Sequence, residues 1–238
     1  MNRGIYAFLE AASPYLVCWS FVFTLVTSIR IAARVRQGRE QVPDSAALTE
    51  LAGLPLTLLQ PVAFVWAVVT RDLPSALLFL WWGPGFVLSA AIVIGAKVRG
   101  RTVDWHPVRY VISYLCKLYY LAYMVVFYRL HMPGMMFAFS VWIINDQFEK
   151  AFMSLDADRL RRTFHDHWVF RILYPTGLLI PWFYPDVPDR VFARGYGIVL
   201  LGLWLAGVAH VHRRGRLGEL PQDPSLLRNM VYFPRLRR

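Results

Sequence analysis

Stretches of about 20 mainly apolar residues alternate along the chain with short polar segments. A helix of about 20 residues crosses a hydrocarbon core about 30 Å thick. The sequence therefore predicts an all-α polytopic membrane protein with seven transmembrane helices. The predicted spans cover residues 10–29, 51–70, 76–96, 110–128, 133–151, 168–184 and 195–212.

The basic residues predict how these spans are oriented. Of the 26 Lys and Arg residues, 25 lie between the spans or within four residues of a span end, and one, Lys117, lies deep inside a span. Alternate gaps hold 20 and 5 of them, and the gaps of the richer set include 30–50 and the C-terminal tail. Because cytoplasmic loops are enriched in Lys and Arg, we expect the N-terminus outside and the C-terminus in the cytoplasm.

The amino-acid composition also indicates a membrane protein, and it bears on which partners the protein can have. The chain has 238 residues, of which 57% are hydrophobic and 17% are charged, against about a quarter in soluble domains. We expect a multi-pass protein of a bacterial inner membrane, whose first apolar stretch is a retained span rather than a signal peptide. The net charge of +11 then reflects topology, so no nucleic-acid partner is expected. Oligomerisation or membership of a larger membrane complex stays open.

No cofactor or metal site is expected. Cys18 and Cys116 lie within spans and belong to no CxxC motif. The pairs His165/His167 and His210/His212 have an i, i+2 spacing, which splays two rings to different faces of a helix and suits chelation poorly.

A weak internal repeat appears when the chain is shifted by 114 residues. The superposed identities are Leu59 on Leu173, Pro61 on Pro175, Asp72 on Asp186, Pro74 on Pro188, Gly83 on Gly197 and Arg99 on Arg213. This predicts a 3+1+3 parallel repeat, in which a linker helix joins two three-helix bundles. The predicted units are a first bundle (1–100), a linker helix (101–131), a second bundle (132–214) and a basic cytoplasmic tail (215–238).

In topology the chain resembles the SWEET and PQ-loop transporter superfamily. That family also has seven spans, an outside N-terminus, a three-one-three repeat and helix-bending prolines in spans one, two, five and six. Here those spans contain Pro14, Pro61, Pro133 and Pro175, although no Pro-Gln pair occurs within the spans. The resemblance implies a small-solute carrier, with Pro61, Pro175, Gly83 and Gly197 as candidate hinges.

The charged side chains inside spans four and five are the candidate functional residues. A charge inside a bilayer costs roughly 2.5–3.5 kcal/mol on insertion scales and therefore requires a partner. An antiparallel hairpin of these spans places Lys117 near position 147, so we expect it to pair with Asp146 or Glu149. Asn145 shares a helical face with Glu149, and Asp146 shares the next face with Lys150. Tyr114 and Trp142 complete the candidate substrate- or ion-site residues.

Three functions remain open from the sequence. The first is the small-solute transporter, because carriers hold their sites at mid-depth between repeated bundles. The second is a membrane enzyme acting on a lipid or isoprenoid, because Asn145 to Glu149 resembles the Asn-x-x-aromatic-Glu element of small seven-span terpene cyclases. In that reading Asp146 or Glu149 is the general acid, although that family carries the element in span two. The third is a non-catalytic subunit of a membrane complex.

Overall fold

A computed structural model describes residues 3–36, 46–80, 106–153 and 168–213, together with positions 91, 95, 98, 99, 160 and 164. These residues form helices, and none of them lies in a strand. The helices are α1 (Arg3–Arg36), α2 (Ala46–Val69), α3 (Leu73–Phe79), α5 (His106–Arg129), α6 (Pro133–Met153), α8 (Trp168–Thr176), the 3₁₀ turn η2 (Gly177–Leu179), α9 (Ile180–Phe183) and α10 (Arg190–Arg213). The all-helical part of the sequence prediction is confirmed.

Among the described residues, two helices are long and apolar enough to cross a membrane. They are the Arg3–Ala33 part of α1 and the Arg190–Val211 part of α10, with mean hydropathies of 1.8 and 1.7. A shorter apolar segment, Leu58–Val69, occupies the second half of α2. The predicted third span begins in α3, and most of it lies outside the described residues. Seven crossings therefore stay a prediction.

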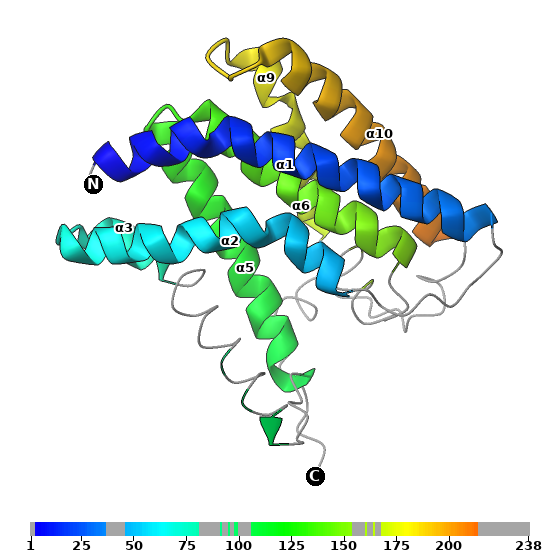
Figure 1. Cartoon of the computed structure of the whole chain (residues 1–238), viewed down its shortest axis with the longest axis horizontal. Coiled ribbons are helices and arrows are strands. Elements are labelled where there is room, and N and C mark those ends of the chain that lie inside the picture. Colours follow the sequence, from blue (N-terminus) through cyan, green and yellow to red (C-terminus); the bar gives the residue numbers. More distant parts are fainter. Residues whose placement is uncertain are drawn as a thin grey trace.

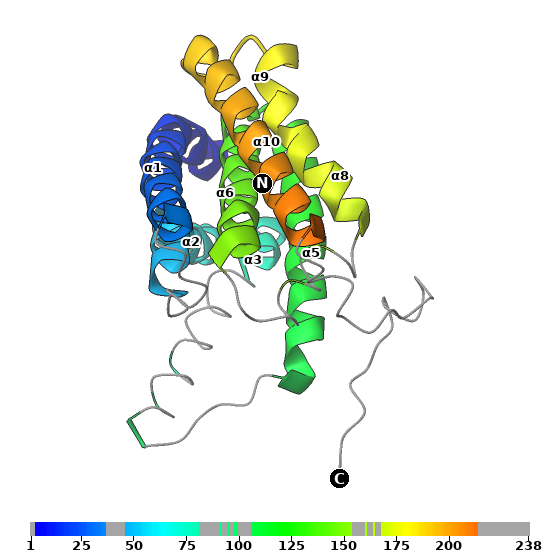
Figure 2. The same cartoon turned by 90° about the vertical axis from the view of Figure 1, so that its right-hand side faces the viewer.

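Helix α6 lies at the centre of the molecule. It packs between α1 and α10, and these three helices run in the same direction (Figures 1 and 2). Helix α2 returns along α1, and α8, η2 and α9 return along α10, while α5 crosses α6 steeply. Segments far apart in sequence thus form the core, and α1, α6 and α10 present facing surfaces along their length.

Two tight turns connect α2 to α3 and α5 to α6, where only a few residues separate the predicted spans. Arg71 and His131 have φ values of 56° and 55°, the left-handed conformation that ends many helices. After α2, the N–H of Asp72 donates to the carbonyl of Ala67 (2.8 Å); after α5, the N–H of Met132 donates to that of Phe127 (2.9 Å). The next helix starts at once in both turns, so each forms a compact hairpin.

The first turns of α3 and α6 have different capping groups. Asp72 caps α3 from within its own turn, accepting from the Ser75 N–H (3.4 Å) and the Ser75 hydroxyl (2.7 Å). The first turn of α6 is capped by Glu10 of α1, whose carboxylate accepts from the N–H groups of Gly134 (2.7 Å) and Met135 (2.9 Å). A carboxylate suits this position because a helix N-terminus carries partial positive charge.

Prolines and glycines shape the return segment beside α10. The helix is interrupted after Pro175, where η2 replaces the α-helix for one turn. A Cβ on Gly177 would overlap the hydroxyl of Ser140, and one on Gly197 would lie 2.9 Å from the Leu178 carbonyl oxygen. These glycines are needed for the close packing of η2 against α6 and α10. Pro61 lies within a continuous α2, and Gly83 lies outside the described residues. The hinges and the repeat both stay predictions.

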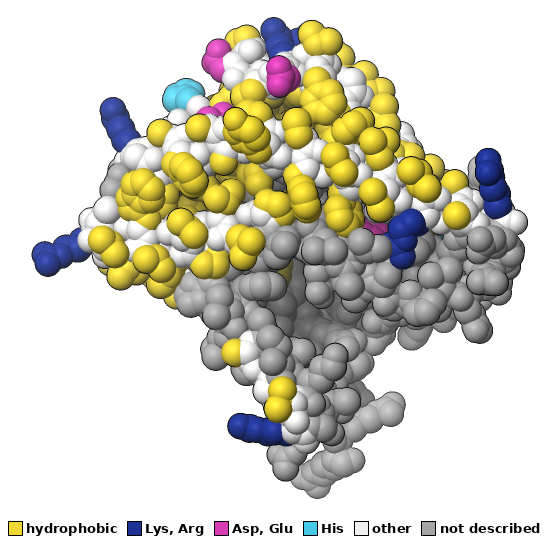
Figure 3. Space-filling view, viewed as in Figure 1, with side chains coloured by type: hydrophobic (Ala, Val, Ile, Leu, Met, Phe, Trp, Pro, Cys, Tyr) yellow, Lys and Arg dark blue, Asp and Glu magenta, His cyan; other side chains and the backbone are white. Residues whose placement is uncertain are grey.

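The interior contains aromatic rings and neutral polar groups, whereas much of the surface is apolar. Tyr123 lies fully buried at the centre of a ring cluster with Phe79, Phe127 and Phe139. Hydrophobic side chains spread across the face of α1 and α2, with Lys and Arg at its edges (Figure 3). The large exposed apolar side chains of α1 and α2 include Phe8, Tyr15, Val22, Leu25, Ile29, Leu58, Val62, Val65, Trp66 and Val69.

Candidate functional site

Three neutral polar side chains meet where α1, α6 and α10 face one another. Thr24 Oγ1 donates to Asn145 Oδ1 (2.6 Å) and lies 2.7 Å from the Tyr196 hydroxyl. Asn145 Nδ2 donates to the Tyr196 oxygen (3.0 Å) and to the carbonyl oxygen of Ser20 (3.2 Å). We call Ser20, Thr24, Asn145 and Tyr196 the central polar cluster. It links the three parallel helices through groups that both donate and accept hydrogen bonds.

The helices position this cluster by simple periodicity. Ser20 and Thr24 are four residues apart on α1 and therefore lie on one face, where Thr24 Oγ1 also contacts the Ser20 carbonyl (3.0 Å). Asn145 is 5% exposed and Tyr196 is 3% exposed. A buried polar group left without a partner costs about 1–3 kcal/mol. The cluster therefore holds α1, α6 and α10 in one relative register.

A second polar contact continues the same interface toward the C-terminal ends of α6 and α10. Trp204 Nε1 donates to Gln147 Oε1 at 2.8 Å, and both side chains are buried. Close packing surrounds this contact, because a Cβ on Gly207 would lie 3.0 Å from the Ala151 Cβ. Helix α6 thus carries buried polar groups over successive turns, all directed into the bundle.

Of the charged residues predicted from the sequence, Asp146 and Glu149 follow Asn145 along α6, and Lys117 lies on α5. Asp146 forms an ion pair with Lys150 along α6, as their i, i+4 spacing predicts. Glu149 is 4% exposed and Lys117 is 8% exposed, so each is an ionisable side chain held inside the protein. Both have interaction partners. Pairing of Lys117 with Asp146 or Glu149 stays a prediction.

The remaining predicted site residues are only partly described. Trp142 is half-buried on α6 and meets the Phe139 ring edge-to-face, with centroids 6.0 Å apart. The Tyr114 side chain and the pair His165/His167 lie outside the described residues. His210 stacks on Phe152 at 4.6 Å. Within the described part of the chain, no group of three or more His, Cys, Asp or Glu side chains could hold a metal ion.

The sequence prediction included Asn145 but not the other members of the cluster, Ser20, Thr24 and Tyr196. Thr24 and Tyr196 lie within predicted spans one and seven, whereas the predicted substrate- or ion-site residues all lie in spans four and five. Gln147 and Trp204 were likewise passed over, although Gln147 lies inside the motif from Asn145 to Glu149. Their position as neutral polar residues inside apolar stretches is the sequence feature that could have identified them. Which of them meet could not be read from periodicity, because the contacts join residues up to 172 positions apart.

Comparison with known proteins found no match. The chain matches no protein-family model, no curated protein and no solved structure.

Proposed function

We propose that this chain is a multi-pass helical membrane protein that carries a small polar solute past the central polar cluster. One observation carries the proposal: hydrogen-bonding side chains from three parallel helices converge in the interior, while the surface of the same helices is apolar. A water-soluble protein normally shows the reverse pattern, because burying polar groups and exposing apolar ones are both unfavourable.

The ends of the helices support the proposed orientation. The turns beside the start of α1 carry Arg71 and Arg129, and Arg190 begins α10 at that same end. Because α1, α6 and α10 run in the same direction, Arg36, Lys150 and Arg213 gather toward the opposite end. In the proposed orientation the second end faces the cytoplasm, together with the basic tail.

The chemistry of the cluster favours an uncharged or zwitterionic polar solute. Its amide, hydroxyl and phenol groups both donate and accept, so a solute's hydroxyl or amide groups can replace the contacts they now make with one another. Exchange of this kind leaves no buried group unpartnered, which keeps the barrier for passage low. Glu149 of α6 and Lys117 of α5 add two buried ionisable side chains on the proposed cytoplasmic side.

Counterflow into proteoliposomes tests the proposal. The purified protein is reconstituted, and uptake of a panel of labelled sugars, amino acids and amines is measured against empty liposomes. Thr24→Val keeps the shape of the side chain and removes its hydroxyl, so flux should fall roughly tenfold or more. Thr70→Val is the matched control, because Thr70 bonds only to carbonyls of its own helix at the end of α2. Equal flux in both variants contradicts the proposal, provided both elute as single species.

A second candidate function rests on the burial of Glu149. An acid that is 4% exposed, one turn from Asn145, could protonate an apolar polyene, as a lipid- or isoprenoid-directed enzyme requires. Aromatic rings packed in the core would stabilise the resulting cation. Incubation with isoprenoid lipids followed by mass spectrometry tests this. Product formation lost in Glu149→Gln and kept in Asp146→Asn supports the enzyme, whereas turnover by both variants excludes a protonating carboxylate here.

A further inference from the structure

Two arginines at the start of α10 bind the same backbone oxygen. Arg190 and Arg194 each donate through Nε to the Pro181 carbonyl, at 3.0 and 3.1 Å. They are four residues apart on one helix and therefore lie on the same face. Arg190 also donates through Nη2 to the Trp182 carbonyl (3.4 Å), and the Arg194 guanidinium lies 4.6 Å from the centroid of the Trp182 ring. These contacts hold two like charges side by side next to the turn between α9 and α10.

The sequence explains the contact with Pro181, but the contact uses only part of each guanidinium. Helix α9 ends at Phe183, and Pro185 has no N–H with which to satisfy the Pro181 carbonyl from the next turn. The two Nε–H groups take its place, as basic side chains often do at a helix C-terminus. A guanidinium has five N–H donors, and those at both Nη atoms of Arg194 and at Nη1 of Arg190 have no hydrogen-bond partner among the described residues. The pair therefore retains charged donors that the fold itself does not use.

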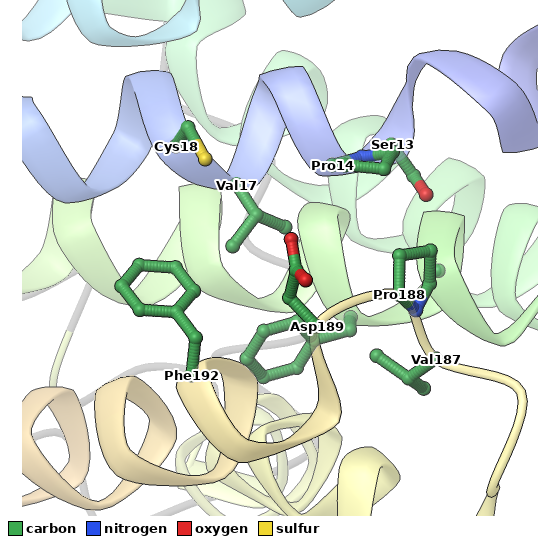
Figure 4. Close-up of a pocket in the computed structure, with 10 residues that line it drawn as sticks. Ser13, Pro14, Val17, Cys18, Val187, Pro188, Asp189 and Phe192 are labelled. Carbon is green, nitrogen blue, oxygen red and sulfur yellow. The ribbon is translucent and has the colours of Figure 1, made fainter.

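No carboxylate of the described residues neutralises this pair. The two acidic residues of the preceding turn, Asp186 and Asp189, are exposed, and neither forms an ion pair with a described residue. Asp189 lines a small pocket together with Ser13, and its carboxylate points toward Val17 of α1 (Figure 4). Two guanidinium charges that share one carbonyl oxygen repel each other, and an anion that bridges them offsets this repulsion.

The surroundings of the pair indicate where that anion comes from. Arg190 begins the segment Arg190–Val211, which is long and apolar enough to cross a membrane. The guanidinium groups therefore lie at the boundary between the hydrocarbon core and the headgroups. Trp182, Phe183 and Val191 beside them are exposed, and exposed aromatic rings are typical of that boundary. Phospholipid phosphates lie at the same depth, and the acyl chains below them can cover the apolar side chains.

We propose that Arg190 and Arg194 bind the phosphate of an anionic phospholipid in the leaflet opposite the cytoplasm. Phosphate oxygens match the planar fork of Arg, which donates two parallel hydrogen bonds to them. Two positive charges favour a lipid with a net negative charge over a zwitterionic lipid, whose ammonium group offsets its own phosphate. The site rests on the membrane placement in the proposed function and is independent of solute transport.

Native mass spectrometry of the purified protein in detergent micelles tests the site. The protein is titrated with phosphatidylglycerol, with phosphatidylcholine of the same acyl chains, or with inorganic phosphate. The wild type should retain one phosphatidylglycerol at a concentration about tenfold below that needed for phosphatidylcholine, and Arg190→Gln/Arg194→Gln should lose this preference. Arg71→Gln/Arg129→Gln is the matched control, because it removes two exposed arginines at the same end of the molecule. It should bind phosphatidylglycerol as the wild type does.

Thermal unfolding separates lipid binding from the structural role of the pair. Phosphatidylglycerol should raise Tm of the wild type and of the control variant, but not that of Arg190→Gln/Arg194→Gln. Arg194→Gln alone leaves the Arg190 contacts with Pro181 and Trp182 in place, so it should fold normally and still bind phosphatidylglycerol several-fold more weakly.

Three results overturn the proposal, whether or not solute flux is observed. The first is equal binding of the two lipids by the wild type. The second is a loss of phosphatidylglycerol binding that is the same in the control variant as in Arg190→Gln/Arg194→Gln, because the effect would then be one of general charge. The third is displacement of the lipid by equimolar inorganic phosphate, which would indicate a site for a soluble anion. Failed flux with intact lipid preference contradicts only the transport function.

Discussion

The turns before α3 and α6 have the same backbone conformation, but different parts of the chain stabilise them. Both use a left-handed residue, Arg71 or His131, and the same pair of backbone hydrogen bonds. The α3 turn is capped by Asp72, which is adjacent in sequence, and the α6 turn by Glu10, more than 120 residues away. The first is therefore complete within a short peptide, while the second forms fully only when α1 docks. Substitutions at the two turns should separate local from tertiary stabilisation.

Gly134→Ala should have the largest effect. The added Cβ meets Ser13 and the Glu10 carboxylate, so α1 and α6 must separate or the cap must break. We expect a loss of about 2–4 kcal/mol in the free energy of unfolding. Unfolding in mixed SDS micelles, followed by tryptophan fluorescence, measures it. Ser13→Ala in the same chain should recover part of the loss, because it removes one of the two clashing groups. If the free-energy changes of the two substitutions simply add in the double variant, the added Cβ does not contact Ser13, and the prediction is wrong.

Glu10→Ala should be the next most damaging. It leaves the N–H groups of Gly134 and Met135 without their carboxylate, and we expect a loss of about 2–3 kcal/mol. Hydrogen exchange should rise at the first turn of α6 and remain unchanged at α3. Tyr15→Ala, an exposed position on the same helix, is the control and should change stability by at most about 0.5 kcal/mol. Equal losses in the two variants would show that Glu10 has no special role.

Asp72→Ala should weaken α3 more modestly. Loss of a local cap typically costs about 1 kcal/mol, and the contact of Tyr6 with Ser75 (2.8 Å) still ties α1 to this turn. Asp72→Ser, which retains a capping oxygen, should recover most of the loss. If Asp72→Ala instead destabilises the protein more than Glu10→Ala, the contrast between a local and a tertiary cap fails.

The smallest effects should come from Arg71→Gly and His131→Gly. Glycine adopts positive φ without the strain of a Cβ, so each change should stabilise the chain by about 0.5–1 kcal/mol. The two gains should be similar, since the φ values differ by one degree, 56° against 55°. The same unfolding assay checks this. Clearly unequal gains would show that the two turns differ in backbone as well as in capping.

The hairpins were predictable because their signals are local. A polar turn with a proline one to three residues later ends one helix and begins the next, as at Asp72 and Pro74. The ion pair of Asp146 with Lys150 was predictable for the same reason, because residues four apart on a helix are neighbours. The long apolar helices α1 and α10 also follow directly from the run of apolar residues.

The candidate site was only half predictable. Asn145 and Glu149 stand out as polar residues in an apolar stretch, but their partners do not. Thr24 and Tyr196 look like ordinary helix residues until α1 and α10 are placed on either side of α6. The cap from Glu10 to the start of α6 was hidden for the same reason, because a carboxylate near an N-terminus gives no sign of the helix it will reach.

The sequence by itself determined where the helices lie, which stretches are apolar and which ends carry basic residues, since each depends on neighbours within a few positions. The tertiary structure decided that α6 lies between α1 and α10, that Asn145 meets Thr24 and Tyr196, and that Ser13 and Asp189 line one pocket. Burial of apolar surface stabilises many different pairings of helix faces by similar free energies. The matching of buried polar groups to one another selects the arrangement in which they are satisfied, and that matching exists only in three dimensions.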